Sequence, residues 1–164
     1  MLQSTYVNRS TINHQITVVL NFDFAYSSLA IHYIEDWTNV FKEVYRVLKP
    51  DSFFIFSCNH PVTYAMRGSD TEENWISKLE VVKNKNTRQV SVIGDYMTDF
   101  KVMNALGKDS VNTWRKSFSE ISKEIHAAGL VIEQIIEPTP LKELEAISPE
   151  VFKRLSKIPK FAIF

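Results

Sequence analysis

The fold is decided by residues 22–58, which read FDFAYSSLAIHYIEDWTNVFKEVYRVLKPDSFFIFSC. The middle of this stretch places apolar side chains at the spacing of one helix face, at Trp37, Val40, Phe41, Val44, Tyr45 and Leu48. Asp36 is a suitable N-cap residue. Pro50 is expected to end the helix, because the residue before a proline avoids the α-helical conformation. The pattern therefore predicts a helix that begins after Asp36 and ends before Pro50.

Extended segments flank this predicted helix on both sides. Residues 22–27 are rich in aromatic side chains and favour a strand. The continuous apolar run at 53–56 lies between the helix and a turn, and it indicates a strand buried on both faces, as in a parallel sheet. Residues 22–58 are thus predicted to form one strand–helix–strand unit with a right-handed crossover, in an α/β fold.

The remaining chain is predicted to complete a single domain. Residues 1–21 cannot be placed, although the β-branched run 16–20 is either a strand or a buried extended stretch. Residues 60–112 are irregular and are interpreted as an insertion over one edge of the sheet, with 89–93 as an edge strand. The last part, 113–164, is predicted to contain a helix and two strands.

That last helix has clear start and stop signals. Ser117 and Glu120 form a capping box, and Gly129 stands where a C′ glycine is expected. The apolar stripe between them consists of Phe118, Ile121, Ile125 and Ala128. The pattern then predicts a strand at 130–136, a short charged helix at 141–147 and a last strand at 160–164.

Composition excludes several classes of partner. The chain has 19 basic and 19 acidic residues, so no excess of positive charge points to nucleic acid or to an anionic membrane. Cys58 is the single cysteine, which rules out an intramolecular disulfide and a thiolate metal cluster. The apolar runs are shorter than a membrane span, and the sequence shows no signal-peptide pattern, so we expect a cytoplasmic protein.

The glycines are too far apart to form a nucleotide-binding loop. They are Gly68, Gly94, Gly107 and Gly129. Such a loop needs two or three glycines within about six residues, so that the backbone can approach the ligand. The sequence therefore contains no glycine loop of this kind.

Polar residues follow the first predicted strand of the unit, at Ser27, Ser28 and His32. Ligands of open α/β sheets bind beyond the carboxyl ends of the strands. His32 is thus either an acid–base group or a core residue that packs on the helix, while the serines either line a ligand or cap a turn.

His60 follows the second strand and is expected at the same edge as His32. No His-x-x-x-His pair occurs, so a metal site is not expected. Cys58 ends a buried strand and is interpreted as a core residue rather than a nucleophile. Four side chains either line an apolar substrate pocket or form the core of a lid: Trp75, Tyr96, Met97 and Trp114.

A family resemblance rests on these same segments. Residues 22–37 and 43–50 resemble the fourth strand and the following helix of class I S-adenosylmethionine (SAM)-dependent methyltransferases of the small-molecule type. Residues 54–61, 127–130, 136–138 and 159–164 also look like that family. The resemblance begins at Phe22 and implies the C-terminal half of a Rossmann-like sheet, strands four to seven, with the last strand antiparallel. Where relatives carry a Gly-Gly pair after Lys49-Pro50, this chain has Asp51-Ser52, and Asp tolerates positive φ better than most residues.

The resemblance also implies roles for individual residues. Ser27, Ser28 and Leu29 match positions that line the methionine side of SAM, and His32 and His60 match positions that face the substrate. The region 60–112 matches the segment that shapes the acceptor pocket, so Tyr33, Tyr96 and Trp114 are expected to contact the substrate. The family's glycine loop, its acidic ribose ligand and its polar adenine ligand have no counterpart in this sequence.

Two functions follow from the resemblance. The first is methyl transfer from SAM to a small molecule, with His32 or His60 as base, weak or inactive in this truncated chain alone. The alternative is a non-enzymatic relic or partner subunit that acts through protein association. Because half of a doubly wound sheet exposes its first strand, we expect a homodimer or a complementing chain that supplies the glycine loop.

Overall fold

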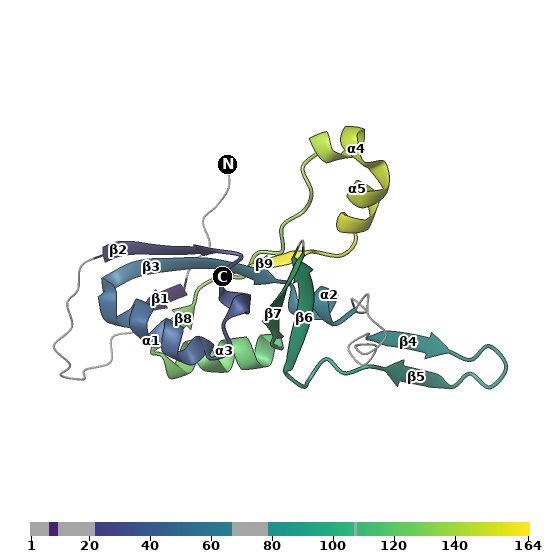
Figure 1. The fold of residues 1–164 in the computed structure, drawn as a ribbon, viewed down its shortest axis with the longest axis horizontal. Helices are drawn as coiled ribbons and strands as arrows, with labels where there is room; N and C mark the ends of the chain where they lie inside the picture. Colours follow the sequence, from purple (N-terminus) through teal and green to yellow (C-terminus); the bar gives the residue numbers. More distant parts are fainter. Residues whose placement is uncertain (1–6, 10–21, 67–78, 107) are drawn as a thin grey trace.

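The computed structural model describes residues 7–9, 22–66, 79–106 and 108–164. Its main sheet has the order β2-β3-β1-β8, and β9 also pairs with β3 (Figure 1). The five strands are β1 (Val7–Arg9), β2 (Phe22–Ser28), β3 (Leu48–Asn59), β8 (Leu130–Ile132) and β9 (Phe161–Ile163).

Strand directions agree with the α/β prediction. β2 and β3 are parallel, and β9 is antiparallel to β3. β1 is antiparallel to both β3 and β8, so β3 and β8 run in the same direction. The predicted α/β class, the parallel pair β2–β3 and the antiparallel last strand are confirmed, but the sheet is mixed, because the antiparallel β1 lies between β3 and β8. The predicted strand at 16–20 lies outside the described residues.

The helix of the deciding stretch is α1 (Trp37–Val47). The side chain of Asp36 accepts a hydrogen bond from the Asn39 N–H at 3.0 Å, as expected of an N-cap. Strand β3 begins directly after α1, so the helix is slightly shorter than its apolar stripe. Asp51 takes a φ of +59°, the conformation that favours glycine and that Asp tolerates.

The second helix is α3 (Phe118–Ala127), and its predicted N-cap Ser117 and C′ glycine Gly129 are confirmed, whereas the Glu120 carboxylate pairs with Lys123 instead of completing a capping box. The Ser117 hydroxyl accepts a hydrogen bond from the Glu120 N–H at 3.2 Å. Gly129 has a φ of +84°, and a Cβ at this position would lie 3.2 Å from the Tyr45 ring of α1. The positive φ therefore favours glycine here, and a Cβ would in addition crowd the Tyr45 ring.

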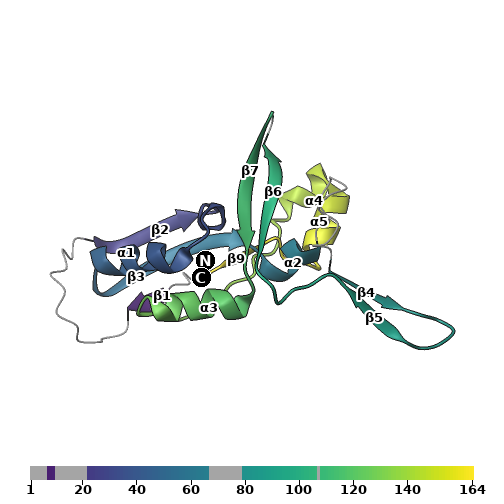
Figure 2. The same ribbon diagram turned by 60° about the horizontal axis from the view of Figure 1, so that its bottom comes forward.

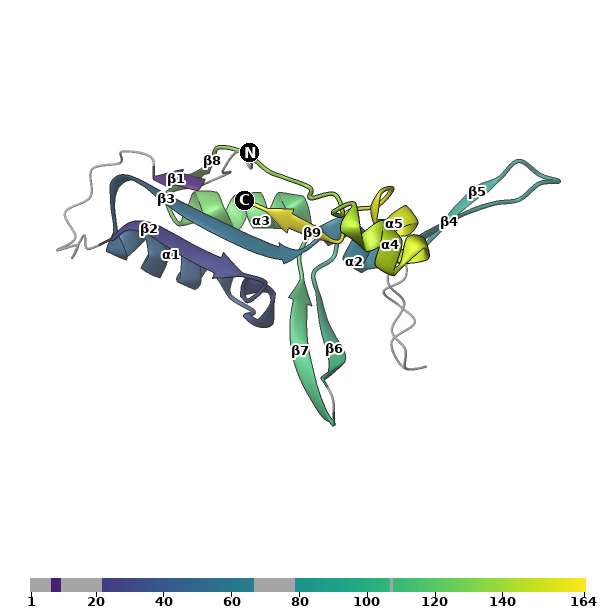
Figure 3. The ribbon, with the colours of Figure 1, turned by 90° about the horizontal axis from the view of Figure 1, so that it is seen from above.

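Helices α1 and α3 cover one face of the sheet, which we call the helix face, and we call the opposite one the open face (Figures 1 and 3). The core lies on the helix face and is dominated by Trp37, Phe41, Phe54, Phe56, Ile121, Ile125, Leu130 and Phe164. The prediction that 53–56 is buried on both faces is wrong: Phe56 is fully buried, but Phe53 is 36% exposed. The reason is that α1 and α3 both pack on the same face.

Residues 60–112 do not add a strand to the main sheet. They contain α2 (Pro61–Met66) and two separate hairpins, β4 (Glu80–Lys83) with β5 (Val90–Ile93) and β6 (Phe100–Leu106) with β7 (Asp109–Arg115). The predicted strand at 89–93 is present as β5, but its expected place at the edge of the main sheet is wrong, because β5 pairs with β4 instead. Both hairpins project from the end of the sheet where β3 leads into α2 (Figure 2).

The C-terminal part contains one element that the sequence did not predict. The predicted short helix is confirmed as α4 (Glu143–Ile147), and α5 (Pro149–Leu155) follows it directly. The predicted strand 130–136 is shorter, since β8 ends at Ile132 and Ile136 forms a single bridge to Ile163. No described helix is both long enough and apolar enough to cross a membrane.

Candidate functional site

A turn held by β3 follows the carboxyl end of β2. Of the three predicted cofactor-binding residues, Ser27 and Ser28 are the last two residues of β2, and Leu29 begins the turn with a φ of +50°. The Leu29 N–H donates to the backbone oxygen of Ser57 at 3.1 Å and to the Ser57 Oγ at 3.0 Å. Ser57 thus fixes the backbone of this turn at the sheet edge where ligands of parallel sheets bind.

His32 lies just beyond this turn, in the short 3₁₀ helix η1 (Ile31–Tyr33), and its side chain is buried. Its Nδ1 faces the backbone N–H of Asn59 at 3.4 Å and must therefore act as the acceptor. Burial lowers the pKa of the His32 imidazole, which favours the neutral ring. In the neutral ring with an accepting Nδ1, the proton is on Nε2.

His60 closes the first turn of α2. Its Nδ1 lies 3.3 Å from the Thr63 N–H, which is the contact of an N-cap side chain. Its Nε2 lies 2.6 Å from Oε1 of Glu137, so this nitrogen carries the proton and donates it. The buried ring also meets the edge of Phe118, with the two ring centroids 5.3 Å apart. His60 therefore connects α2 to the segment after β8 and to α3.

The two histidines lie at the same edge of the sheet, but a neighbouring group occupies Nδ1 in each. A general base needs an unprotonated nitrogen that faces the substrate. In His32 and His60 the accepting nitrogen faces a backbone N–H instead. Their role as bases stays a prediction, and these contacts favour a positioning role.

Cys58 is fully buried, and burial raises the pKa of its thiol to about 12. This agrees with the interpretation of Cys58 as a core residue, because a nucleophilic cysteine needs a low pKa. Among the described residues, no group of three or more His, Cys, Asp or Glu side chains could hold a metal ion.

The predicted substrate-binding residues have different neighbours. The ring of Tyr33 lies beside His32, and the Tyr96 hydroxyl accepts a hydrogen bond from the Phe118 N–H at 3.0 Å, so Tyr96 caps α3. Trp114 stands on β7 beneath the Lys101 ammonium, 5.7 Å from the ring centroid. Met97 is exposed, and Trp75 lies outside the described residues. These contacts do not bring the described aromatic residues together around one cavity.

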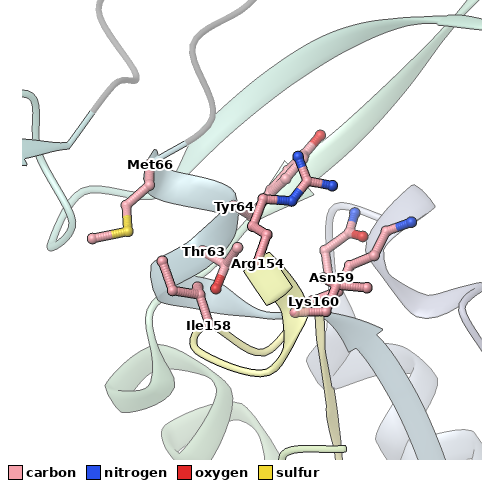
Figure 4. A pocket seen from close by; sticks show the side chains of 8 residues that line it. Asn59, Thr63, Tyr64, Met66, Arg154, Ile158 and Lys160 are labelled. Atoms are coloured by element: carbon pink, nitrogen blue, oxygen red, sulfur yellow. The ribbon is translucent and has the colours of Figure 1, made fainter. Parts of the chain in front are cut away.

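A pocket of about 250 Å³ opens beside this edge (Figure 4). One side comes from the end of β3 and from α2, and the other comes from the last turn of α5 and the segment that leads to β9. Eight residues line it: Asn59, Thr63, Tyr64, Met66, Arg154, Leu155, Ile158 and Lys160. The pocket is close to the turn in the chain, because Asn59 is two residues beyond Ser57 and both side chains lie on the open face of β3.

None of these eight residues was predicted from the sequence. The pocket lies between residues 59–66 and residues 154–160, and a local sequence pattern cannot predict that two segments so far apart in the chain come together. One signal for α5 was present, since Pro149 after Ser148 is a typical first residue of a helix.

Comparison with known proteins agrees with this fold. Residues 19–56 match the family model described as a methyltransferase domain. An uncharacterized protein of Haemophilus influenzae is 25% identical over 150 residues, which cover 85% of this chain and 56% of that protein.

Two solved structures have a similar fold. One is an S-adenosylmethionine-dependent methyltransferase from Mesorhizobium loti, with a TM-score of 0.61 and 24% identity, covering 91% of this chain and 63% of that one. The other is a putative S-adenosylmethionine-dependent methyltransferase from Listeria monocytogenes, with a TM-score of 0.61, 22% identity and coverages of 91% and 62%. This chain therefore spans less than two thirds of the length of each of these three proteins.

Proposed function

From the place of this chain in the class I SAM-dependent methyltransferase family, we propose that it forms the acceptor side of a methyl-transfer site for a small molecule. The main observation behind this proposal is that the end of β3 contacts both the turn after β2 and the pocket. Ser57 of β3 fixes the turn at Leu29, and Asn59, on the same face two residues later, lines the pocket. A cofactor at the turn and an acceptor in the pocket would thus meet at the end of β3.

The residues present fit part of the cofactor. Ser27 and Ser28 are small and polar, and the exposed Ser28 stands at the open end of β2. They suit the methionine end of SAM, whose bound form supplies the methyl group. The four widely spaced glycines offer no loop for the rest of the cofactor. We therefore propose weak cofactor binding by this chain alone and stronger binding when a further polypeptide segment completes the site.

The chain's own residues then act mainly by positioning. Transfer of a methyl group from a sulfonium requires close alignment of the acceptor and exclusion of water. The turn would orient one reactant, and the pocket would hold the other. His32, with its proton on Nε2, would donate a hydrogen bond rather than remove a proton.

Titration with S-adenosylhomocysteine, followed by amide NMR shifts, tests the cofactor half of this proposal. We expect weak, saturable shifts at residues 27–33 and 57–60. Ser57→Ala, which removes one acceptor of the Leu29 N–H, should weaken binding, and Ser119→Ala on the exposed side of α3 should not. If no shifts appear at these residues at millimolar ligand, the proposed cofactor contact is wrong.

A second candidate function, protein association, is supported by the open face. Four aromatic side chains of β2 and β3 stand there, each at least one third exposed: Phe22, Phe24, Tyr26 and Phe53. The rings of Phe24 and Tyr26 lie nearly parallel, with centroids 6.4 Å apart. β2 is also an edge strand of the described sheet, with β3 as its partner. Apolar faces and free edges of this kind favour association.

Light scattering across a range of protein concentrations tests this second candidate. A homodimer should dissociate when Phe24 and Tyr26 are both changed to Ser, whereas Tyr33→Ser, an exposed aromatic residue elsewhere, should leave the mass unchanged. A wild-type monomer at high concentration would exclude the homodimer. In that case a complementing chain would be the remaining partner to test.

A further inference from the structure

We propose that the pocket between α2 and α5 binds a small organic acid, whose carboxylate lies against Arg154 and Lys160. The inference deepens the proposed function by naming the chemical class of the methyl acceptor. It rests on the proposed function only in identifying the bound acid as that acceptor. Anion binding itself would stand without any methyl transfer.

Charge is the first argument for an anion. The lining contains two cationic side chains, Arg154 and Lys160, and no acidic one. Among the described residues, neither cation forms an ion pair with a carboxylate; the Lys160 ammonium lies 5.0 Å from the Phe161 ring centroid instead. Two cations beside one cavity, unneutralised by described acids, favour a negatively charged ligand.

The remaining lining explains why the ligand should be organic rather than inorganic. Tyr64, Met66, Leu155 and Ile158 present an aromatic ring and aliphatic chains. The polar groups of the α2 residues are already used, because the Thr63 hydroxyl donates to the Pro159 carbonyl at 2.5 Å and the Tyr64 hydroxyl bonds to Thr113. A ligand would thus find a cationic side and an apolar side.

The geometry of the cations favours a planar acid group. Arg154 belongs to the last turn of α5 and extends beside Tyr64, while Asn59 and Lys160 stand on the neighbouring side (Figure 4). A guanidinium binds a carboxylate through two parallel hydrogen bonds, and an ammonium adds a point charge. The volume of about 250 Å³ is below the range of about 300–1,000 Å³ that is typical of pockets for drug-sized ligands. A molecule with one ring or a short chain is therefore the expected size.

Benzoate and its neutral isostere benzamide are suitable probes for the full chain. Amide NMR titration should show benzoate shifting residues of α2 and α5, with benzamide at least about tenfold weaker, since it keeps the ring but loses the charge-assisted contacts. The same experiment with S-adenosylhomocysteine reports on the end of β2 and the turn at Leu29. Loss of one response without the other separates this inference from the proposed function.

Variants of α5 provide a matched control. Arg154→Gln should weaken benzoate binding about tenfold. Arg154→Lys should weaken it less, because lysine keeps the positive charge and loses only the two parallel hydrogen bonds of the guanidinium. Lys153→Gln removes the same charge from the neighbouring residue, which does not line the pocket, and should change binding little. Arg154 and Lys153 are both exposed, so folding is expected to survive, and the wild-type spectrum elsewhere verifies it.

Three results would overturn the inference. The first is no benzoate response in α2 or α5 at millimolar concentrations. The second is equal binding of benzoate and benzamide, which would mean apolar recognition only. The third is an equal effect of Lys153→Gln and Arg154→Gln, which would mean general attraction to a positive surface.

Discussion

The two faces of the main sheet are built from the same two strands but have opposite environments. On the helix face, Phe54 and Phe56 are buried among the side chains of α1 and α3. On the open face, Phe53 alternates with them along β3, and Phe24 and Tyr26 stand beside it on β2 with 51% and 64% of their surface exposed. The side chains on both faces are apolar, so residue type does not account for the difference.

This comparison shows that the described part of the molecule completes only one of two layers. A sheet stacked between helices needs apolar side chains on both faces. The composition of β2 and β3 is that of such a sheet, whereas α1 and α3 cover one side only. The open face is thus suited to contact a further layer, and the experiments below measure how differently the two faces behave without one.

The largest expected difference is between two phenylalanines of β3. Phe56→Ala removes a ring that packs against Phe41, Phe54 and Phe164, and it should lower the free energy of unfolding by about 3–5 kcal/mol. Phe53→Ala deletes the same atoms from the open face, where the side chain is 36% exposed, and should cost less, about 1–2 kcal/mol. Urea unfolding followed by tryptophan fluorescence measures both.

Equal losses for the two variants would contradict the comparison. They would mean that the open face is covered in solution. If the loss at Phe53 then decreased as the protein was diluted, the cover would be a second molecule rather than part of the same chain.

The helix face is also the part that sequence patterns predicted best. The stripes and caps of α1 and α3 are local signals, so the sequence alone assigns Asp36, Ser117 and Gly129 as cap residues. The apolar run at 53–56 could not reveal which of its side chains a helix would cover, because strand burial depends on distant elements. The error at Phe53 has this cause.

The candidate site was predictable only in its first part. Ser27 and Ser28 end a strand with a clear pattern, and Leu29 begins the turn at the expected sheet edge, while the contact of these residues with the cofactor stays a prediction. The pocket depends on α5, which has only seven residues, and on its approach to α2. Short helices show little hydrophobic periodicity, so the sequence did not indicate that Arg154 lines a pocket.

A buried ion pair offers the second test of the two faces. The Lys116 ammonium lies 2.5 Å from Oε1 of Glu124 on the helix face, and it also stands 5.6 Å from the centroid of the Trp37 ring. Burial raises the pKa of Glu124, and Lys116 opposes this shift. Glu124→Gln leaves a buried ammonium without its carboxylate and should cost about 3 kcal/mol.

The matched surface pair is Lys49 with Asp23, which joins β3 to β2 at 2.8 Å with both side chains largely exposed. Asp23→Asn should cost less than about 1 kcal/mol, because water screens exposed ions. Chemical denaturation of both variants at low and high salt measures the contrast. A loss below about 1 kcal/mol for Glu124→Gln would show that water reaches Lys116. It would contradict the conclusion that α1 and α3 exclude water from the helix face.

The smallest expected effect concerns His32 and appears only as a function of pH. Burial places the pKa of His32 below its ordinary value of 6.5 in the folded chain, so below pH 6.5 the unfolded chain binds the extra proton more readily. This contribution to stability is complete above pH 6.5 and is lost as the pH falls towards the folded pKa. In urea unfolding at pH 7.5, 6.5 and 5.5, wild type should therefore lose more stability on acidification than His32→Asn.

His126→Asn, a change at an exposed histidine of α3, is the control and should follow the wild-type curve. If His32→Asn and wild type gave parallel curves, water would have to reach the His32 ring, and the contact with Asn59 would not keep this end of the sheet closed.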